Sequence, residues 1–276
     1  MWESLLRQKS RFELLPTAED LMQEPISIND SSTIYTAAEK ILDHNISGVV
    51  VKKSDSHQYI SQKSIASILL TDHQNIKEIE AAKKSQEMHL VDMLAPISNC
   101  ANLMLKLRIN ALGVKDSSGL RGIITKHDLV RYYGENIVDE TKLADVMSVG
   151  SFFVPHTTTL YDALHKMFDS GVSRLLIKDD SEKPVGIVTY KSFLKNALYW
   201  SNRYEDNVFS SGFGRICKIG DIMKREVISV SLNTGLAKIA KILIDYRVHG
   251  VAVSRGQKIV GFVTEKDIVR QLARMS

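Results

Sequence analysis

Apolar residues in the second half of the chain recur at the spacing of an amphipathic helix. The positions i, i+3, i+4, i+7 and i+8 are Leu160, Ala163, Leu164, Met167 and Phe168. The run opens after three threonines, 157–159, and ends before Ser170 and Gly171, which favour a helix stop. The pattern predicts a helix over 160–168, preceded by a short apolar strand over 151–155.

Two β-rich runs follow this helix, over 174–178 and 184–189, and the turn-forming residues 179–183 separate them. A further helix is predicted to begin near Tyr190. The order is therefore strand, helix, strand, strand, helix. The same order is predicted near the C-terminus over 227–230, 236–245, 250–253 and 259–264. We expect two such units to bury their sheets against each other.

The end of the third strand and the start of the second helix form a motif that occurs four times. Its hydroxyl residues are spaced 64, 64 and 75 residues apart, at Ser61, Thr125, Thr189 and Thr264. A second marker precedes each copy, in the segments Asp20-Leu-Met22, Asp92-Met-Leu94, Asp145-Val-Met147 and Asp221-Ile-Met223. Two markers in the same order, four times, predict a repeat protein.

The markers place repeats over 17–69, 90–134, 140–196 and 218–276. Three segments depart from the pattern: an amphipathic N-terminal extension over 1–16, a polar helical connector over 70–89, and an aromatic-rich insertion over 197–217. The insertion and its flanks carry Tyr199, Trp200, Tyr204, Phe209 and Phe213. Such a segment either packs on its own domain, which we favour, or binds a partner.

Composition limits the functional classes. The chain has 276 residues, of which 44% are hydrophobic and 25% charged, and a net charge of +4 that allows nucleic acid or a small anion as ligand. Cys100 and Cys217 are too few for a disulfide framework. Neither a signal peptide nor a run of about 20 apolar residues is present, so we expect a cytoplasmic protein without membrane contact.

The sequence carries no catalytic or metal-binding motif. No H-x-x-x-H or comparable spacing links the eight histidines, which are His44, His57, His73, His89, His127, His156, His165 and His249. G-x-S-x-G, P-loop and G-x-G-x-x-G motifs are also missing. We therefore expect neither an enzyme nor a metal site.

The four copies resemble the cystathionine-β-synthase (CBS) domain, a module of about sixty residues. The resemblance rests on the Asp-x-Met opening, a second strand such as 250–253, and the closing Gly-apolar-x-Thr-x-x-Asp motif. It implies an α/β (α+β) fold with four β-α-β-β-α repeats, paired into two Bateman modules in a stand-alone protein. It also implies clefts for adenosine-containing ligands such as AMP, ADP or ATP, with S-adenosylmethionine and NAD left open, and no required cofactor.

The chemistry of the closing motif suits a nucleotide. Thr125 and Thr264 end a strand at a helix start, where a hydroxyl and free backbone N–H groups can hold phosphate. Asp128 and Asp267 follow in the first turn, where a carboxylate can accept hydrogen bonds from ribose hydroxyls. The competing interpretation is a capping box with Asp in place of Glu. We favour ligand contact because Ser64 and Ser192 replace the acid in the other two copies.

By the resemblance, each cleft also uses the paired repeat. The expected contributors to the Asp128 cleft are Ser32, Ala37, Ile46, Ser47 and Gly48. The expected contributors to the Asp267 cleft are Thr158, Ala163, Val172, Ser173 and Arg174. Arg174 is the one charge at its place among the four copies, and it either forks onto phosphate or faces solvent. The clefts closed by Ser64 and Ser192 are expected to be empty or to bind another ligand.

The leading hypothesis is a regulatory protein that senses an adenine nucleotide and signals to another protein, or through a homodimer, by a shift between its repeats. The first alternative is a nucleic-acid-binding regulator that uses the basic excess and the insertion. The second alternative is a scaffold whose clefts bind no ligand. The sequence alone leaves all three open.

Overall fold

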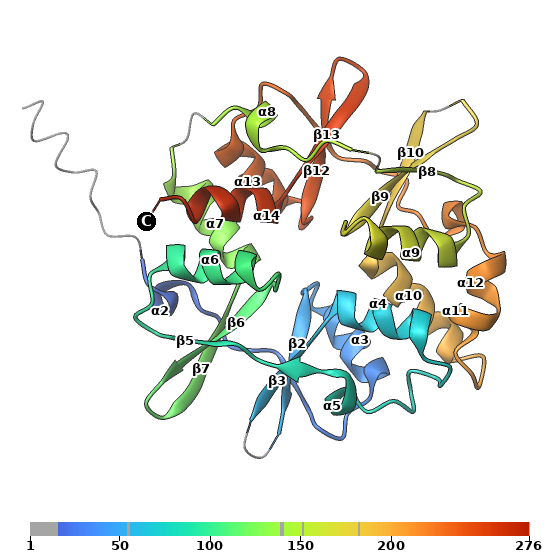
Figure 1. Ribbon diagram of the computed structural model, residues 1–276, viewed down its shortest axis with the longest axis horizontal. Coiled ribbons are helices and arrows are strands. Elements are labelled where there is room, and N and C mark those ends of the chain that lie inside the picture. The colour runs from blue at the N-terminus through green and yellow to red at the C-terminus, as the bar shows by residue number, and fades with distance from the viewer. Residues whose placement is uncertain (1–15, 54–55, 139–140, 151, 182, 276) are drawn as a thin grey trace, which may run out of the picture.

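The computed structural model describes residues 16–275 apart from 54–55, 139–140, 151 and 182. In this part of the chain, four units with a small sheet and helices each lie around a ring (Figure 1). We number them repeats 1 to 4 in chain order. The mixed α/β fold expected from the sequence is confirmed. The expected N-terminal extension over 1–16 lies outside the described residues except for Pro16.

The first two repeats and the connector hold these elements. Repeat 1 has α2 (Ala18–Leu21), β1 (Ser27–Asn29), α3 (Ile34–Asp43), β2 (Gly48–Lys52), β3 (His57–Ser61) and α4 (Gln62–Thr71). The connector has α5 (Ala81–Lys84) and β4 (Gln86–Glu87). Repeat 2 has β5 (Leu90–Asp92), α6 (Ile97–Lys106), β6 (Ala111–Asp116), β7 (Gly119–Thr125) and α7 (Lys126–Asn136).

The other two repeats follow the same order. Repeat 3 has α8 (Leu143–Val146), β8 (Phe153–Pro155), α9 (Leu160–Asp169), β9 (Arg174–Lys178), β10 (Pro184–Thr189) and α10 (Tyr190–Ser201). The short helices α11 (Val208–Ser211) and α12 (Phe213–Ile216) follow. Repeat 4 has η1 (Ile219–Asp221), β11 (Ser229–Ser231), α13 (Leu236–Asp245), β12 (Gly250–Arg255), β13 (Lys258–Thr264) and α14 (Glu265–Leu272).

Each sheet has the same topology. The first strand of a repeat pairs in parallel with the second, across the first helix, and the second pairs antiparallel with the third. A parallel pair needs such a crossover connection, which explains why the helix intervenes. The connector differs from the expected mostly helical segment: besides α5 it supplies β4, which adds a strand beside β3.

The sheets pack in the expected pairs. Between repeats 1 and 2, one buried cluster contains Val50, Met88, Ala111 and Ile123. Between repeats 3 and 4, the equivalent cluster contains Leu176, Ala252 and Phe262. These sheet pairs, 1 with 2 and 3 with 4, are the two modules of the chain.

The helices join the two modules. One large apolar core combines helices of repeats 1 and 3, with α4 and α10 in contact, and another combines helices of repeats 2 and 4, with α7 against α13 and α14. Figure 1 shows the helices of repeats 2 and 4 grouped on the left side of the ring and those of repeats 1 and 3 on the right side. Each repeat therefore packs its sheet within a module and its helices on the other module.

The glycine of the closing motif is explained by packing. A Cβ at Gly122 would lie 2.7 Å from Met22 Sδ, and a Cβ at Gly186 would lie 2.4 Å from Met223 Sδ. Each methionine belongs to the Asp-x-Met opening of the partner repeat in the same module. Repeat 1 has Gln58 at this place, and there β4 pairs directly with the strand. The two markers of the repeat thus form one contact.

The aromatic-rich insertion packs on both modules. Phe209 is buried in the core of repeats 1 and 3, with its ring 6.0 Å from that of Phe193 and 6.2 Å from that of Trp200. Asn207 donates from its side-chain amide to the carbonyls of Leu69 and Asp72, at 3.2 and 2.7 Å. The segment therefore covers the junction between repeats 1 and 3.

None of the helices in the described residues combines the length and apolar run that crossing a bilayer requires.

Candidate functional site

The four hydroxyl residues of the closing motif stand at helix starts. Ser61 Oγ accepts from the backbone N–H of Ser64 at 3.0 Å. Thr189 N donates to Ser192 Oγ at 3.3 Å. A serine can therefore replace the aspartate in the cap, so the change from Asp to Ser among the repeats does not by itself indicate a ligand.

Asp128 and Asp267 complete capping boxes. Asp128 Oδ2 accepts from the N–H and the hydroxyl of Thr125, at 2.9 and 2.6 Å. Asp267 Oδ2 accepts from the same groups of Thr264, at 2.9 and 2.8 Å. The capping interpretation is thus realised in the structure, and the ribose contact stays a prediction.

The second oxygen of each carboxylate faces an arginine one turn later. Arg270 Nη1 lies 3.0 Å from Asp267 Oδ1, and Arg131 Nη1 lies 3.6 Å from Asp128 Oδ1. Both aspartates are buried, with exposed fractions of 1% and 6% for Asp267 and Asp128. Burial raises the pKa of Asp128, although hydrogen bonds from Thr125 lower it. Each carboxylate oxygen has two lone pairs, so Oδ1 can accept from a ligand as well as from arginine.

The residues expected around the Asp128 cleft occupy varied places. The Ser47 hydroxyl lies 3.2 Å from that of Tyr59, and a Cβ on buried Gly48 would lie 2.5 Å from the Tyr59 ring. Ile46 offers its carbonyl to the side chain of Gln62 at 2.7 Å. The Ser32 carbonyl accepts from the N–H of Ala81 at 2.8 Å, whereas the methyl group of Ala37 is buried in the apolar core.

Tyr59 is a residue at this cleft that the sequence did not suggest. It packs between the sheets of repeats 1 and 2 beside Ala111 and Ile123. Burial raises the pKa of Tyr59 to about 12, although the hydrogen bond with Ser47 lowers it. Tyr59 therefore stays a neutral phenol that covers the expected edge of the cleft.

The residues expected around the Asp267 cleft also lie in different environments. Ala163 is buried in the core, and the Thr158 carbonyl accepts from the N–H of Ile219 at 2.8 Å. The Val172 carbonyl accepts from the hydroxyl of Tyr190 at 3.3 Å. Ser173 is exposed, and its hydroxyl accepts from Arg174 Nη2 at 3.3 Å. Of this set, Thr158 bonds to repeat 4 through its backbone and Arg174 through its side chain.

Arg174 crosses from repeat 3 into repeat 4. Its Nη2 donates to the carbonyl of His249 at 2.9 Å, and a Cβ on Gly250 would lie 2.4 Å from its Nη1. Only 6% of Arg174 is exposed, so it is not solvent-facing. Burial lowers the pKa of Arg174 to about 10, although the charges of Glu265 and Asp267 raise it. The guanidinium therefore stays charged at neutral pH beside Asp267.

The residue after each hydroxyl reaches back toward the start of the second strand of its own repeat. The pairs are Gln62 with the Ile46 carbonyl, Lys126 with Asn110, Tyr190 with the Val172 carbonyl, and Glu265 with His249. Burial lowers the pKa of Lys126 to about 8, Glu265 raises it and Lys266 lowers it. Four equivalent positions thus place four different chemical groups beside the start of the second strand.

The next residue along reaches the other module. Lys191 of repeat 3 donates to the side-chain oxygen of Asn45 in repeat 1. His127 of repeat 2 lies with Nδ1 3.0 Å from Glu265 Oε1 in repeat 4. These positions carry polar contacts across the two junctions between modules.

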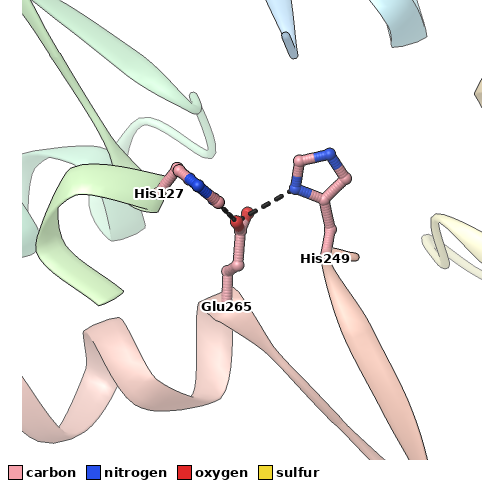
Figure 2. A group of neighbouring side chains, drawn as sticks. All are labelled: His127, His249 and Glu265. Atoms are coloured by element: carbon pink, nitrogen blue, oxygen red, sulfur yellow. Dashed lines mark hydrogen bonds and ion pairs between the residues drawn. The ribbon is translucent and has the colours of Figure 1, made fainter. Parts of the chain in front are cut away.

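Two histidines meet on one carboxylate oxygen at the junction of repeats 2 and 4. Figure 2 shows Glu265 at the start of α14 between His127 on α7 and His249, which precedes β12. His249 Nδ1 lies 2.9 Å from the same Oε1 that His127 approaches. Although burial raises the pKa of Glu265, the charge of His249 and hydrogen bonds from both histidines lower it well below its ordinary value.

Sequence spacing could not reveal this group. His127 and Glu265 are 138 residues apart, and only the packing of repeat 2 on repeat 4 brings them together. The one available signal lies in comparing the repeats: Glu265 is the one acid at a place otherwise held by Gln62, Lys126 and Tyr190.

Comparison with known sequences assigns the chain to a family. The sequence profile of the CBS domain matches residues 18–70, 77–135, 143–199 and 219–274. The chain belongs to the CBS domain family. Its four CBS repeats and their pairing by sheets correspond to the two Bateman modules expected from the resemblance.

Other proteins are similar to this chain in sequence or in fold. Protein MJ1404 from Methanocaldococcus jannaschii is 23% identical over 268 residues, which cover 94% of this chain and 62% of that protein. The crystal structure of MJ1225 from the same organism, proposed to be an archaeal homologue of γ-AMPK, matches with a TM-score of 0.77 at 18% identity. It covers 93% of this chain and 100% of that chain. A conserved protein from Pyrococcus horikoshii matches with a TM-score of 0.62 at 19% identity and covers 93% of this chain and 99% of that one.

The chain spans between 48% and 62% of the length of the first curated relatives it matches. Regions that match this chain also occur within larger proteins. One is an inosine-5'-monophosphate dehydrogenase from M. jannaschii, 29% identical over 133 residues that cover 46% of this chain and 26% of the enzyme.

Proposed function

We propose that this CBS protein senses an adenosine nucleotide, which binds between repeats 3 and 4 and, by a second site, between repeats 1 and 2. In the first cleft, Arg174 contacts phosphate and Asp267 the ribose. In the second, Asp128 takes the ribose role. Binding then changes how the modules pack and so regulates another protein or a second copy of this chain.

The observation that carries the proposal is the environment of Arg174. Its Nε is buried and has no hydrogen-bond partner among the described residues, while its Nη2 donates to the His249 carbonyl. Leaving a buried donor unsatisfied costs about 1–3 kcal/mol, and more for a charged group. A phosphate oxygen would satisfy this donor and the charge together, because guanidinium binds phosphate through paired N–H groups.

The neighbouring helix start suits the other end of the ligand. Thr264 and Asp267 stand in the first turn of α14, where backbone N–H groups and the helix dipole favour an anion. Asp267 Oδ1 keeps a lone pair beside Arg270 for a ribose hydroxyl.

The two clefts are expected to differ in affinity. Repeat 1 has Gly48 where repeat 3 has Arg174, and Tyr59 covers that edge. The Asp128 cleft therefore lacks this phosphate fork and should bind more weakly. The clefts closed by Ser64 and Ser192 lack the ribose acid, so we expect them to be empty or to hold another ligand.

A regulatory rather than catalytic role is supported by the variety of enzymes that contain matching regions. A dehydrogenase and a homoserine O-acetyltransferase catalyse unrelated reactions, and the matched region covers 26% and 47% of their lengths. A segment that is present in both enzymes is not expected to catalyse either reaction. The partner protein is the component whose activity we expect to change.

The test is thermal unfolding and calorimetric titration with AMP, ADP, ATP, NAD and S-adenosylmethionine. A ligand at 100 times its Kd should add about 2.7 kcal/mol to folded-state stability, a shift of a few degrees. Each variant is compared with its own ligand-free form, because Asp267→Asn also weakens a cap. Asp20→Asn is the matched control, since Asp20 completes an exposed capping box with Thr17.

We expect Asp267→Asn to abolish the tighter binding event, Asp128→Asn the weaker one, and Asp20→Asn neither. Nucleotide binding unchanged in both cleft variants would overturn the site assignment. If no nucleotide binds, a DNA or RNA titration at two salt concentrations separates the alternatives. A steep loss of affinity with salt would support the nucleic-acid regulator, and no binding at all the scaffold.

A further inference from the structure

His127, His249 and Glu265 together offer metal-ligating atoms, and the proposed nucleotide clefts do not use them. One donor atom from each residue lies within 4.8 Å of the other two. The donors come from α7, from the residue before β12 and from the first turn of α14 (Figure 2). Three elements of two repeats therefore converge on one point between the modules.

We propose that this group binds a divalent transition-metal ion, with zinc as the best fit, and that the ion bridges repeats 2 and 4. Imidazole nitrogens select zinc and similar ions over magnesium and calcium, which prefer oxygen ligands. Two histidines and one glutamate are also a recognised three-ligand zinc set that leaves a fourth position open.

The distances indicate how far the three side chains would have to move. Zinc bonds of about 2.0–2.2 Å to nitrogen and oxygen place tetrahedral ligands about 3.3 Å apart. The two Nδ1 atoms lie 3.0 and 2.9 Å from Glu265 Oε1, so those separations need to grow by a few tenths of an ångström. The nitrogens of the two rings lie within 4.8 Å of each other, so rotation of the imidazoles would have to bring them up to about 1.5 Å closer. Each imidazole would coordinate through Nδ1 with its proton on Nε2, which requires a change of tautomer and no redox step.

Burial is also suitable. The Glu265 side chain is 13% exposed, whereas His127 and His249 are 31% and 32% exposed. Glu265 is the first residue of α14, its carboxylate contacts both histidines, and the partly exposed rings give an ion a route from solvent.

The surrounding charges are of both signs, and their balance determines the expected affinity for the metal ion. Lys126 and Arg174 interact electrostatically with Glu265, and Lys266 lies near Lys126. Their positive charges oppose a cation, whereas Glu265 and the buried carboxylate of Asp267 favour it. We therefore expect binding weaker than that of closed structural zinc sites with four ligands.

The experiment is calorimetric titration of the full chain, freed of purification tag and metal, with zinc chloride at about pH 7.5 and without nucleotide. Most free imidazole is neutral there, since its pKa is about 6.5. The variants are His127→Gln, His249→Gln and Glu265→Gln, with His89→Gln as a control because His89 is exposed outside the group. Circular dichroism in chelator checks that each variant is folded.

We expect one zinc ion per chain in the wild type and in His89→Gln. Each of the three site variants should bind at least tenfold more weakly, since even outer-shell partners of metal ligands cost about 10–100-fold. Zinc should raise the Tm of the wild type and not that of Glu265→Gln, which can still accept hydrogen bonds from both histidines. The absence of saturable zinc binding, or unchanged binding in both histidine variants, would overturn the proposal whatever the nucleotide titrations show.

Discussion

Replacing Arg174 by methionine tests whether this arginine binds a ligand or stabilises the fold. The guanidinium is buried between repeats 3 and 4, its Nε has no partner in the described part of the chain, and Glu265 and Asp267 lie nearby. If Arg174 serves to hold those two carboxylates, its removal should destabilise the fold. If it serves an absent anion, the ligand-free protein should tolerate its loss.

The magnitude follows from the desolvated charge. Lowering the pKa of Arg174 from 12.5 to about 10 means that folding opposes the charged form by about 3 kcal/mol, since each pH unit corresponds to about 1.4 kcal/mol. Methionine removes this unfavourable free energy of burying the charge. It also removes the hydrogen bonds to the His249 carbonyl and the Ser173 hydroxyl, which are worth about 1.5 kcal/mol each. The two effects nearly cancel, so the unfolding free energy should change by less than about 1 kcal/mol.

The assay is chemical unfolding of both proteins, with and without the nucleotide that binds the wild type. Arg174→Met should keep its ligand-free stability and bind that nucleotide at least tenfold more weakly, a loss of about 1.4 kcal/mol. Arg255→Met is the control, because Arg255 is exposed at the far end of β12. A ligand-free loss of about 3–5 kcal/mol, typical of breaking a buried ion pair, would refute the reasoning and make Arg174 structural.

Two further predictions concern packing and the thiols. Gly186→Ala should destabilise the protein by about 1–3 kcal/mol in chemical unfolding, because the new Cβ meets Met223. Gly150→Ala is the control and should change stability by less than about 0.5 kcal/mol, because Gly150 is exposed and its new Cβ would lie 3.7 Å from the nearest atom; equal effects would contradict the packing argument. At about pH 8, iodoacetamide should label half-buried Cys217 faster than Cys100, which is fully buried and whose pKa burial raises to about 11; mass spectrometry of native and unfolded samples checks this, and equal native labelling would contradict it.

The elements of each repeat could be predicted because their signals are local. The stripe from Leu160 to Phe168 lies within α9, and the stop at Ser170 and Gly171 holds, with Gly171 at a φ of +63°. The sheet pairing also followed from the pattern, since a sheet with one apolar face must cover it. These predictions needed only residues that are neighbours in sequence.

The chemistry between repeats could not be predicted in this way. Whether Arg174 would be buried or solvent-facing depended on Gly250, 76 residues later, which leaves room for the guanidinium. The contact of His127 with Glu265 depended on which repeats share a helical core, and the sequence does not state that repeat 2 faces repeat 4. The role of the closing glycine was likewise hidden, because its methionine partner lies in another repeat.

The four repeats nevertheless act as an internal comparison that separates folding from function. Where all copies agree, as at Ser61, Thr125, Thr189 and Thr264, the shared group stands at a helix start and serves every repeat alike. Where the copies differ at an equivalent place, the fold does not require one particular residue type. The local chemical role then determines which residue is present. Arg174 and Glu265 are such departures, and both point to the region where repeat 4 meets its neighbours. A residue that is unique among four equivalent and otherwise well-folded positions is therefore the first place to look for ligand chemistry in this chain.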